Sequence, residues 1–180
     1  ELVSHHYEND SQILEIKISK LKKIIKLNLI GKVQIKNIFM SILAAIKSGV
    51  DINTILKSII NLKPAEGRLE KIGEIKNNSK VILDYAHTPD ALSIVLKNIR
   101  EQFPTGKIKL VFGCGGDRDK SKRIKMGKIA EKFADVIYLT DDNPRNENPN
   151  MIRSDIKKGI KSKNFFEISS RKKAILNCIN

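Results

Sequence analysis

Polar and apolar positions alternate in two segments near the start of the chain. The alternation runs over Gln12–Ile18 and again over Lys23–Leu29. Because successive side chains of a strand point to opposite faces, each segment is typical of a half-buried β-strand. We therefore expect the two segments to pair as a hairpin that is closed by a short turn.

Helical spacing replaces this alternation further along the chain. Apolar residues recur every three or four positions between Val33 and Ser48, and Gly49 ends the run as a left-handed helix cap would. Asp51 is a typical N-cap residue and predicts a second helix over Ile52–Leu62. Proline and glycine punctuate residues 63–68, which we predict to be a domain boundary.

Strands and helices alternate beyond that boundary. Short apolar runs typical of strands lie at Val81–Asp84, Lys109–Phe112, Val136–Thr140 and Phe165–Ile168. Helical patterns follow them at Ala91–Phe103, Ser121–Ala134, Asn150–Lys161 and Arg171–Ile179. This order predicts a Rossmann-like α/β fold with a mostly parallel sheet, whose ligands bind beyond the carboxyl ends of the strands.

The chain is basic, with 34 Lys and Arg residues against 20 Asp and Glu residues and a formal net charge of +14. Such an excess attracts phosphates, so a basic nucleic-acid-binding module is one alternative. The lysines are spread along the chain rather than gathered in one patch, which disfavours that alternative. Four arginines sit in unusual segments punctuated by glycine or proline, where a planar guanidinium suits a carboxylate or phosphate: Arg68, Arg118, Arg123 and Arg145.

Other classes of protein have little support. Apolar runs stay below the roughly 18 residues that a membrane span needs, and no signal segment opens the chain. Cys114 and Cys178 form neither a CxxC pair nor a Cys/His cluster, so we predict no disulfide framework and no zinc site. We expect a cytoplasmic protein that binds neither nucleic acid nor membrane.

Polar clusters directly follow the first three predicted strands of the α/β part. They span residues 84–90, 113–123 and 141–147. Because the carboxyl ends of parallel strands meet at one edge of a sheet, we expect these clusters to lie together.

The first cluster combines helix-start residues with residues that helix-start chemistry leaves unexplained. Thr88-Pro89-Asp90 is typical of an N-cap, a proline at the first helical position and an acidic first turn. Asp84, Tyr85 and His87 are left over. A carboxylate there can accept ribose hydroxyls or reach a metal through water, and a Tyr or His ring can stack on a base.

The other two clusters suit charged ligands. A dinucleotide fingerprint starting at Gly113 would need glycine where this chain has Arg118, and no Gly-Lys pair precedes Ser or Thr as in a P-loop. The alternative for this segment is a solvated charged turn. In residues 141–147, Arg145 can grip a carboxylate while acidic groups receive an ammonium, as a zwitterion requires. The alternative here is a capped loop before the next helix.

Together these segments resemble the Mur ligase family. The motifs that carry the resemblance are Leu29-Ile30-Gly31, Gly67-Arg68-Leu69-Glu70, Asp84-Tyr85-Ala86-His87-Thr88-Pro89-Asp90, Val111-Phe112-Gly113-Cys114-Gly115-Gly116-Asp117-Arg118-Asp119 and Thr140-Asp141-Asp142-Asn143-Pro144-Arg145. The resemblance implies that residues 1–66 are the tail of the family's central ATPase domain. Residues 67–180 would be its Rossmann-like C-terminal domain, truncated at its end. The chain would thus be the C-terminal portion of a longer enzyme.

The resemblance implies an ATP-dependent acid–amino-acid ligase of peptidoglycan precursor synthesis. ATP would phosphorylate the glutamyl carboxylate of UDP-N-acetylmuramoyl-L-alanyl-D-glutamate, and an amine of meso-diaminopimelate would attack the acyl phosphate. The Asp-Asn-Pro-Arg segment is similar to that of diaminopimelate-adding members. The alternatives are a sister ligase that adds L-lysine and a folate polyglutamate-type ligase. ATP and Mg²⁺ would be held mainly by the central domain, and we expect a monomer.

The resemblance also assigns site residues. The nucleotide-binding set is Arg68, Asp84, Tyr85, His87 and Asn37. The diaminopimelate-binding set is Arg118, Asp142, Asn143 and Arg145. Neither a catalytic residue nor a metal ligand is expected in this chain, so its residues would act by positioning and charge neutralisation. One position departs from the family pattern, which has Asn where this chain has Gln34.

Overall fold

The computed structural model describes residues 1–18 and 21–180. The chain forms two compact units, one of Glu1–Tyr85 with Glu101–Pro104 and the other of Ala86–Arg100 with Thr105–Asn180. The domain division at residues 66 and 67 stays a prediction. Within the described residues, each helix is too short or too polar to cross a membrane.

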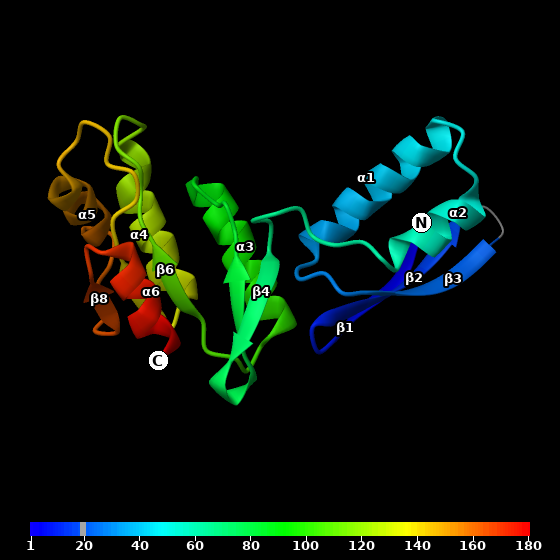
Figure 1. The fold of residues 1–180 in the computed structure, drawn as a ribbon, viewed down its shortest axis with the longest axis horizontal. Coiled ribbons are helices and arrows are strands. Elements are labelled where there is room, and N and C mark those ends of the chain that lie inside the picture. Colours follow the sequence, from blue (N-terminus) through cyan, green and yellow to red (C-terminus); the bar gives the residue numbers. More distant parts are fainter. Residues whose placement is uncertain (19–20) are drawn as a thin grey trace. The chain divides into compact units, whose positions relative to one another are not determined.

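The first unit begins with an antiparallel sheet in the order β1-β2-β3 (Figure 1). Its strands are β1 (Leu2–Glu8), β2 (Ser11–Ile18) and β3 (Leu21–Leu27). The predicted pairing of the second and third strands is confirmed. The predicted turn between them includes residues 19 and 20, which lie outside the described residues. Strand β1 was not predicted, because its Ser-His-His run lacks the apolar alternation that marks a half-buried strand.

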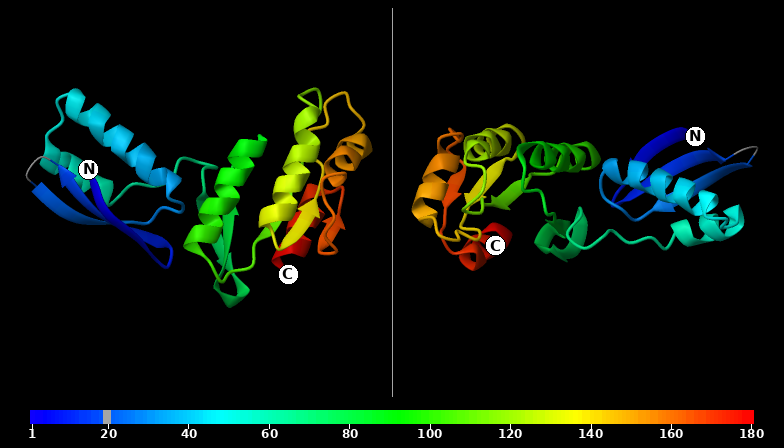
Figure 2. Two further views of the ribbon diagram at one scale, coloured as in Figure 1. Left: turned by 180° about the vertical axis from the view of Figure 1, so that it is seen from behind. Right: turned by 90° about the horizontal axis from the view of Figure 1, so that it is seen from above.

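Helices α1 (Val33–Lys47) and α2 (Ile52–Ile59) pack on one face of this sheet (Figure 2). Their buried isoleucines meet the inward residues of β2 and β3 in a single apolar core. Gly49 has a φ of +83° and follows α1 as predicted. The Asp51 carboxylate accepts hydrogen bonds from the N–H groups of Asn53 and Thr54, at 2.8 and 3.2 Å, which confirms the predicted cap of α2.

A separate hairpin follows, made of β4 (Glu70–Ile75) and β5 (Ser79–Leu83) around the short 3₁₀ turn η1 (Lys76–Asn78). The prediction that residues 81–84 belong to the parallel sheet is wrong, because β5 pairs antiparallel with β4. The reason lies in the turn: Asn77 and Asn78 have φ values of 60° and 56°. Asparagine tolerates this left-handed conformation, which tight hairpins require.

The second unit is an α/β fold around a parallel sheet in the order β6-β7-β8, which confirms the predicted fold class. The strands are β6 (Lys109–Phe112), β7 (Val136–Leu139) and β8 (Phe165–Glu167). The helices are α3 (Pro89–Gln102), α4 (Ser121–Phe133), α5 (Pro149–Lys157) and α6 (Arg171–Ile179). Helix α6 covers the face of the sheet opposite to α4 (Figure 2).

The core of this unit contains side chains from helices α3 and α4 and from the parallel sheet. Leu96 of α3, Met126 of α4 and Leu139 of β7 are all fully buried in it. The Thr88 hydroxyl accepts the Ala91 N–H at 3.3 Å, so the predicted start of α3 is confirmed.

Helices α4 and α5 touch through glycine. A Cβ atom added at Gly127 would lie 2.2 Å from the Ile156 carbonyl oxygen, and one at Gly159 would lie 2.3 Å from that of Ile124. The chain therefore leaves α5 at Lys157, before the predicted end at Lys161, and passes directly against α4. This tight packing holds α4 and α5 together, and the loops after β6 and β7 end at these two helices.

Candidate functional site

A polar cluster in the first unit forms where β5 ends. The Leu69 N–H donates to Asp84 Oδ2 at 2.9 Å, and the Tyr85 N–H donates to the Gly67 carbonyl at 2.8 Å. These bonds place Arg68 beside Tyr85, with its guanidinium carbon 5.3 Å from the centre of the tyrosine ring. The structure thus brings three of the predicted nucleotide-binding residues together.

Helix α1 joins this cluster through Gln34. Its side-chain amide donates to the Arg68 carbonyl at 3.0 Å, and its side-chain oxygen accepts from Asn37 Nδ2 at 3.1 Å. Gln34 is only 8% exposed. The residue that departs from the family pattern is therefore a buried link between Asn37 and Arg68. Its link to Arg68 could not be predicted from the sequence, because the partner there is a backbone carbonyl.

The chemistry of this cluster fits a nucleotide. Tyr85 is 66% exposed, so its ring is accessible for stacking on a base. Arg68 offers a guanidinium for phosphate, and Asp84 offers a carboxylate for ribose hydroxyls. Between them, the buried Leu69 has a φ of 48°, a left-handed conformation unusual for leucine, which the bond to Asp84 helps to hold.

His87 lies in the second unit, at the start of α3. Its backbone carbonyl accepts a hydrogen bond from Lys122 Nζ at 2.8 Å. This contact joins the first predicted cluster to the first turn of α4, where the second cluster ends.

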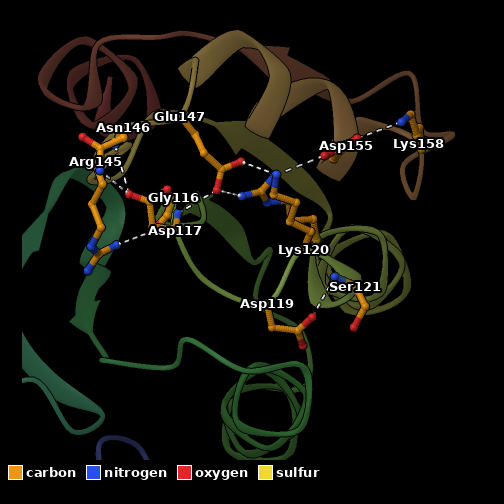
Figure 3. Close-up of polar contacts among 11 residues, drawn as sticks. Gly116, Asp117, Asp119, Lys120, Ser121, Arg145, Asn146, Glu147, Asp155 and Lys158 are labelled. Carbon is orange, nitrogen blue, oxygen red and sulfur yellow. Dashed lines mark hydrogen bonds and ion pairs between the residues drawn. The ribbon is translucent and has the colours of Figure 1, made fainter.

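The second and third predicted clusters meet, as the parallel sheet requires (Figure 3). They follow the neighbouring strands β6 and β7. The Gly116 N–H donates to the Asn143 carbonyl at 2.8 Å. A Cβ atom at Gly116 would lie 1.9 Å from the Pro144 carbonyl oxygen, so only glycine permits this approach. The glycines here make room for the other loop.

Two exposed guanidinium groups are anchored on successive carbonyls. Arg145 Nη1 donates to the Gly116 carbonyl at 2.7 Å, and Arg118 Nη1 donates to the Asp117 carbonyl at 3.0 Å. Asn143 Oδ1 accepts the Arg145 N–H at 3.1 Å and helps to hold the turn. The two arginines are thus oriented by the same short backbone segment.

Asp142 adds the opposite charge to this region. It is 3.9 Å from Arg171 Nη1 and is one of the residues that line a small depression too narrow to hold a water molecule. The wall of the depression also contains Cys114, Pro144 and Arg153. Guanidinium groups and carboxylates on one surface can hold a zwitterionic amino acid.

Arg123 has a structural role. Its side chain is 1% exposed and pairs with Glu147 at 2.8 Å and with Asp155 at 3.2 Å. Its guanidinium therefore grips carboxylates of the protein itself. Arg153 was not predicted as a similar residue, and its guanidinium contacts Asp141, Glu167 and Asn150. Its only signal is an arginine kept in a lysine-rich chain.

Glu147 connects the loop after β7 with the loop after β6 and with helix α4. The Arg123 guanidinium and the Asp117 N–H both donate to it, and together they lower the pKa of its carboxyl to about 2. Lys120 Nζ lies 3.4 Å from its other oxygen. Within the described residues, no group of three or more His, Cys, Asp or Glu side chains is arranged to hold a metal ion.

The second unit is thus an α/β domain in which charged loops follow the carboxyl ends of parallel strands and are suited to bind a charged ligand. The profile of the Mur ligase glutamate ligase domain matches residues 67–180. This chain belongs to the Mur ligase family.

Similar proteins include diaminopimelate ligases. The UDP-N-acetylmuramoyl-L-alanyl-D-glutamate–2,6-diaminopimelate ligase of Fusobacterium nucleatum is 41% identical over 100% of this chain and 39% of its own length. That of Rickettsia typhi is 44% identical over 84% of this chain and 30% of its own length. The chain thus spans between 30% and 39% of these relatives.

Solved structures give the same family and fold. A UDP-N-acetylmuramoyl-L-alanyl-D-glutamate–2,6-diaminopimelate ligase matches with a TM-score of 0.68 and 32% identity, over 97% of this chain and 36% of that one. A folylpolyglutamate synthase of Mycobacterium tuberculosis has a TM-score of 0.75 at 17% identity, over 98% of this chain and 40% of that one. The second similarity shows the fold alone.

The lowered pKa of Glu147 predicts how the stability of the fold depends on pH. A carboxyl with a folded pKa of about 2 and an ordinary value of 4.5 stabilises the fold above pH 4.5. That contribution is lost as the pH falls from about 4.5 to about 2. In the complete protein, Glu147→Gln should therefore lower the Tm at pH 7, and its deficit relative to wild type should shrink as the pH falls through this range.

The matched control is Glu66→Gln, which changes an exposed glutamate and should leave the Tm unchanged at every pH. A deficit of Glu147→Gln that stayed constant from pH 7 to pH 3 would show that the charge of Glu147 does not stabilise the fold.

Proposed function

We propose that this chain is the C-terminal part of an ATP-dependent ligase that adds meso-diaminopimelate to UDP-N-acetylmuramoyl-L-alanyl-D-glutamate. The observation that carries the proposal is the pair of clasped loops, which presents Arg118, Asn143 and Arg145 with Asp142 on one unit. Relatives with this activity in their names are 41% and 44% identical to the chain.

The loop that follows β7 supports diaminopimelate as the incoming amino acid. Diaminopimelate carries a second ammonium and carboxylate at its far end, where lysine has only an ammonium. A guanidinium is a good partner for that extra carboxylate, and Arg145 and Arg118 supply two exposed ones. Asp142 would receive an ammonium.

The chain's own residues would contribute position and charge. Arg145 and Arg118 would orient the amino acid so that its reacting amine faces the activated carboxylate, and such orientation lowers the barrier by removing the entropy cost of approach. We assign no nucleophile or general base to these residues. Turnover would therefore need the rest of the enzyme.

Nucleotide binding is proposed for the first unit. Tyr85 would stack on the base, Asp84 would accept ribose hydroxyls and Arg68 would approach the phosphates, with Asn37 assisting. The nucleotide role of His87, which belongs to the second unit, stays a prediction. When bound, ATP supplies the phosphoryl group that activates the glutamyl carboxylate. Magnesium is assigned to the part of the enzyme outside this sequence. We also propose that the enzyme is monomeric and cytoplasmic.

The substrate assignment is tested by phosphate release from the complete enzyme with ATP and the UDP-linked dipeptide. We expect release to depend on meso-diaminopimelate, with L-lysine and L-glutamate giving much lower kcat/KM. The reason is that neither competitor has a carboxylate and an ammonium at its far end. Equal or faster release with L-lysine would assign the chain to a lysine-adding ligase, and release with glutamate on a folate substrate would assign it to the folate type.

The nucleotide assignment predicts the effect of changing Tyr85. Base stacking on an aromatic ring is worth about 1–3 kcal/mol, so Tyr85→Leu should raise the KM for ATP by about fivefold or more and leave that for diaminopimelate unchanged. Tyr85→Phe keeps the ring and is the control, with an expected KM near wild type. An unaltered ATP KM in Tyr85→Leu would remove Tyr85 from the nucleotide site.

A further inference from the structure

The dipeptide Gly116–Asp117 carries both of the anchored guanidinium groups. Its two carbonyls accept from Arg145 Nη1 and Arg118 Nη1, at 2.7 and 3.0 Å. The direction of each guanidinium therefore depends on where this dipeptide is held. Neither carbonyl belongs to the regular structure of a strand or helix, so the sheet alone does not fix them.

The dipeptide is held from the loop that follows β7. The Gly116 and Asp117 N–H groups donate to the Asn143 carbonyl at 2.8 Å and to Glu147 Oε1 at 2.6 Å. In return, the Asp117 carboxylate accepts two hydrogen bonds from Asn146. The Asn146 backbone N–H and its side-chain Nδ2 both donate to Asp117 Oδ2, at 3.2 and 2.8 Å (Figure 3).

The backbone of this clasp is in an unfavourable conformation. Asp117 and Arg145 have φ values of 51° and 49°, in the left-handed region that non-glycine residues rarely adopt. Such conformations persist where surrounding contacts hold them. At Asp117 the side chain supplies such a contact, because its bonds to Asn146 reach the residue that directly follows Arg145.

We propose that Asp117 is a positioning residue for the amino-acid site: by clasping Asn146, its carboxylate fixes the Gly116–Asp117 carbonyls and thereby the directions of Arg118 and Arg145. This inference rests on the proposed function. In this proposal Asp117 acts on the substrate only indirectly. Its effect passes through the two guanidinium groups.

Asparagine is the variant that separates position from charge. Both Asn146 bonds go to the same oxygen of Asp117, so the single side-chain oxygen of Asn at this position can accept both. Asparagine also tolerates the left-handed conformation. Alanine removes both bonds and has no such tolerance.

The experiment measures KM and kcat of the complete enzyme for Asp117→Ala, Asp117→Asn and the control Asp119→Ala. Asp119 is an exposed carboxylate of the same loop, and it accepts the Ser121 N–H at 2.8 Å instead of taking part in the clasp. We expect Asp117→Ala to raise the KM for diaminopimelate on the order of tenfold. The KM for ATP should stay unchanged, and Asp117→Asn and Asp119→Ala should behave nearly as wild type.

Three results would overturn the inference. An unchanged diaminopimelate KM in Asp117→Ala would show that the clasp does not orient the site. Equal impairment of Asp117→Asn and Asp117→Ala would show that the negative charge acts directly on the substrate. An equal rise in the KM for ATP, with a fall in Tm larger than that of Asp119→Ala, would indicate a general structural loss. Wild-type turnover tests the proposed function separately, since the variants are compared with whichever amino acid the wild type accepts.

Discussion

The contact between the loops after β6 and β7 is the constraint on which the amino-acid site depends. Parallel neighbours release their chains at the same sheet edge, and here the two loops approach until Gly116 has no room for a side chain. Hydrogen bonds then join Gly116 and Asp117 to residues 143–147. The exposed arginines are oriented because their anchoring carbonyls belong to this contact.

The buried ion pairs of Arg123 also support the contact between the loops after β6 and β7. Arg123 sits on α4, and its two carboxylate partners lie in the loop after β7 and on α5. Removing one partner of a buried ion pair leaves the other charge uncompensated, so such pairs fix geometry even where they add little stability. The close approach of α4 to α5 at Gly127 and Gly159 sets the distance that Arg123 has to span.

Much of the second unit could be predicted from the sequence, because its signals are local. The strand over Lys109–Phe112 and the helix over Arg171–Ile179 have the bounds that their apolar patterns indicated. The meeting of the second and third polar clusters followed from strand order alone. Strand partners were harder to predict. The apolar run at 81–84 does not reveal its partner, and the hairpin depends on the turn at Asn77 and Asn78, whose asparagines were not recognised as a turn signal.

The candidate sites were predictable as residue types and motifs, and their supporting contacts were not. Gln34 and Asp117 act through backbone carbonyls or a neighbouring loop, and such partners leave no mark in the sequence. Arg123 looked like a ligand-binding arginine until its burial showed that it pairs with carboxylates of the protein itself. Guanidinium chemistry indicates a carboxylate or phosphate partner, but whether that partner is internal or a substrate depends on burial.

The most direct test of this account is the KM for meso-diaminopimelate of the complete enzyme carrying Arg145→Ala. This change removes both the bond to the Gly116 carbonyl and the guanidinium offered to the substrate. We expect the KM for the amino acid to rise at least on the order of tenfold, while the KM for ATP stays constant. An unchanged KM for the amino acid would contradict the account.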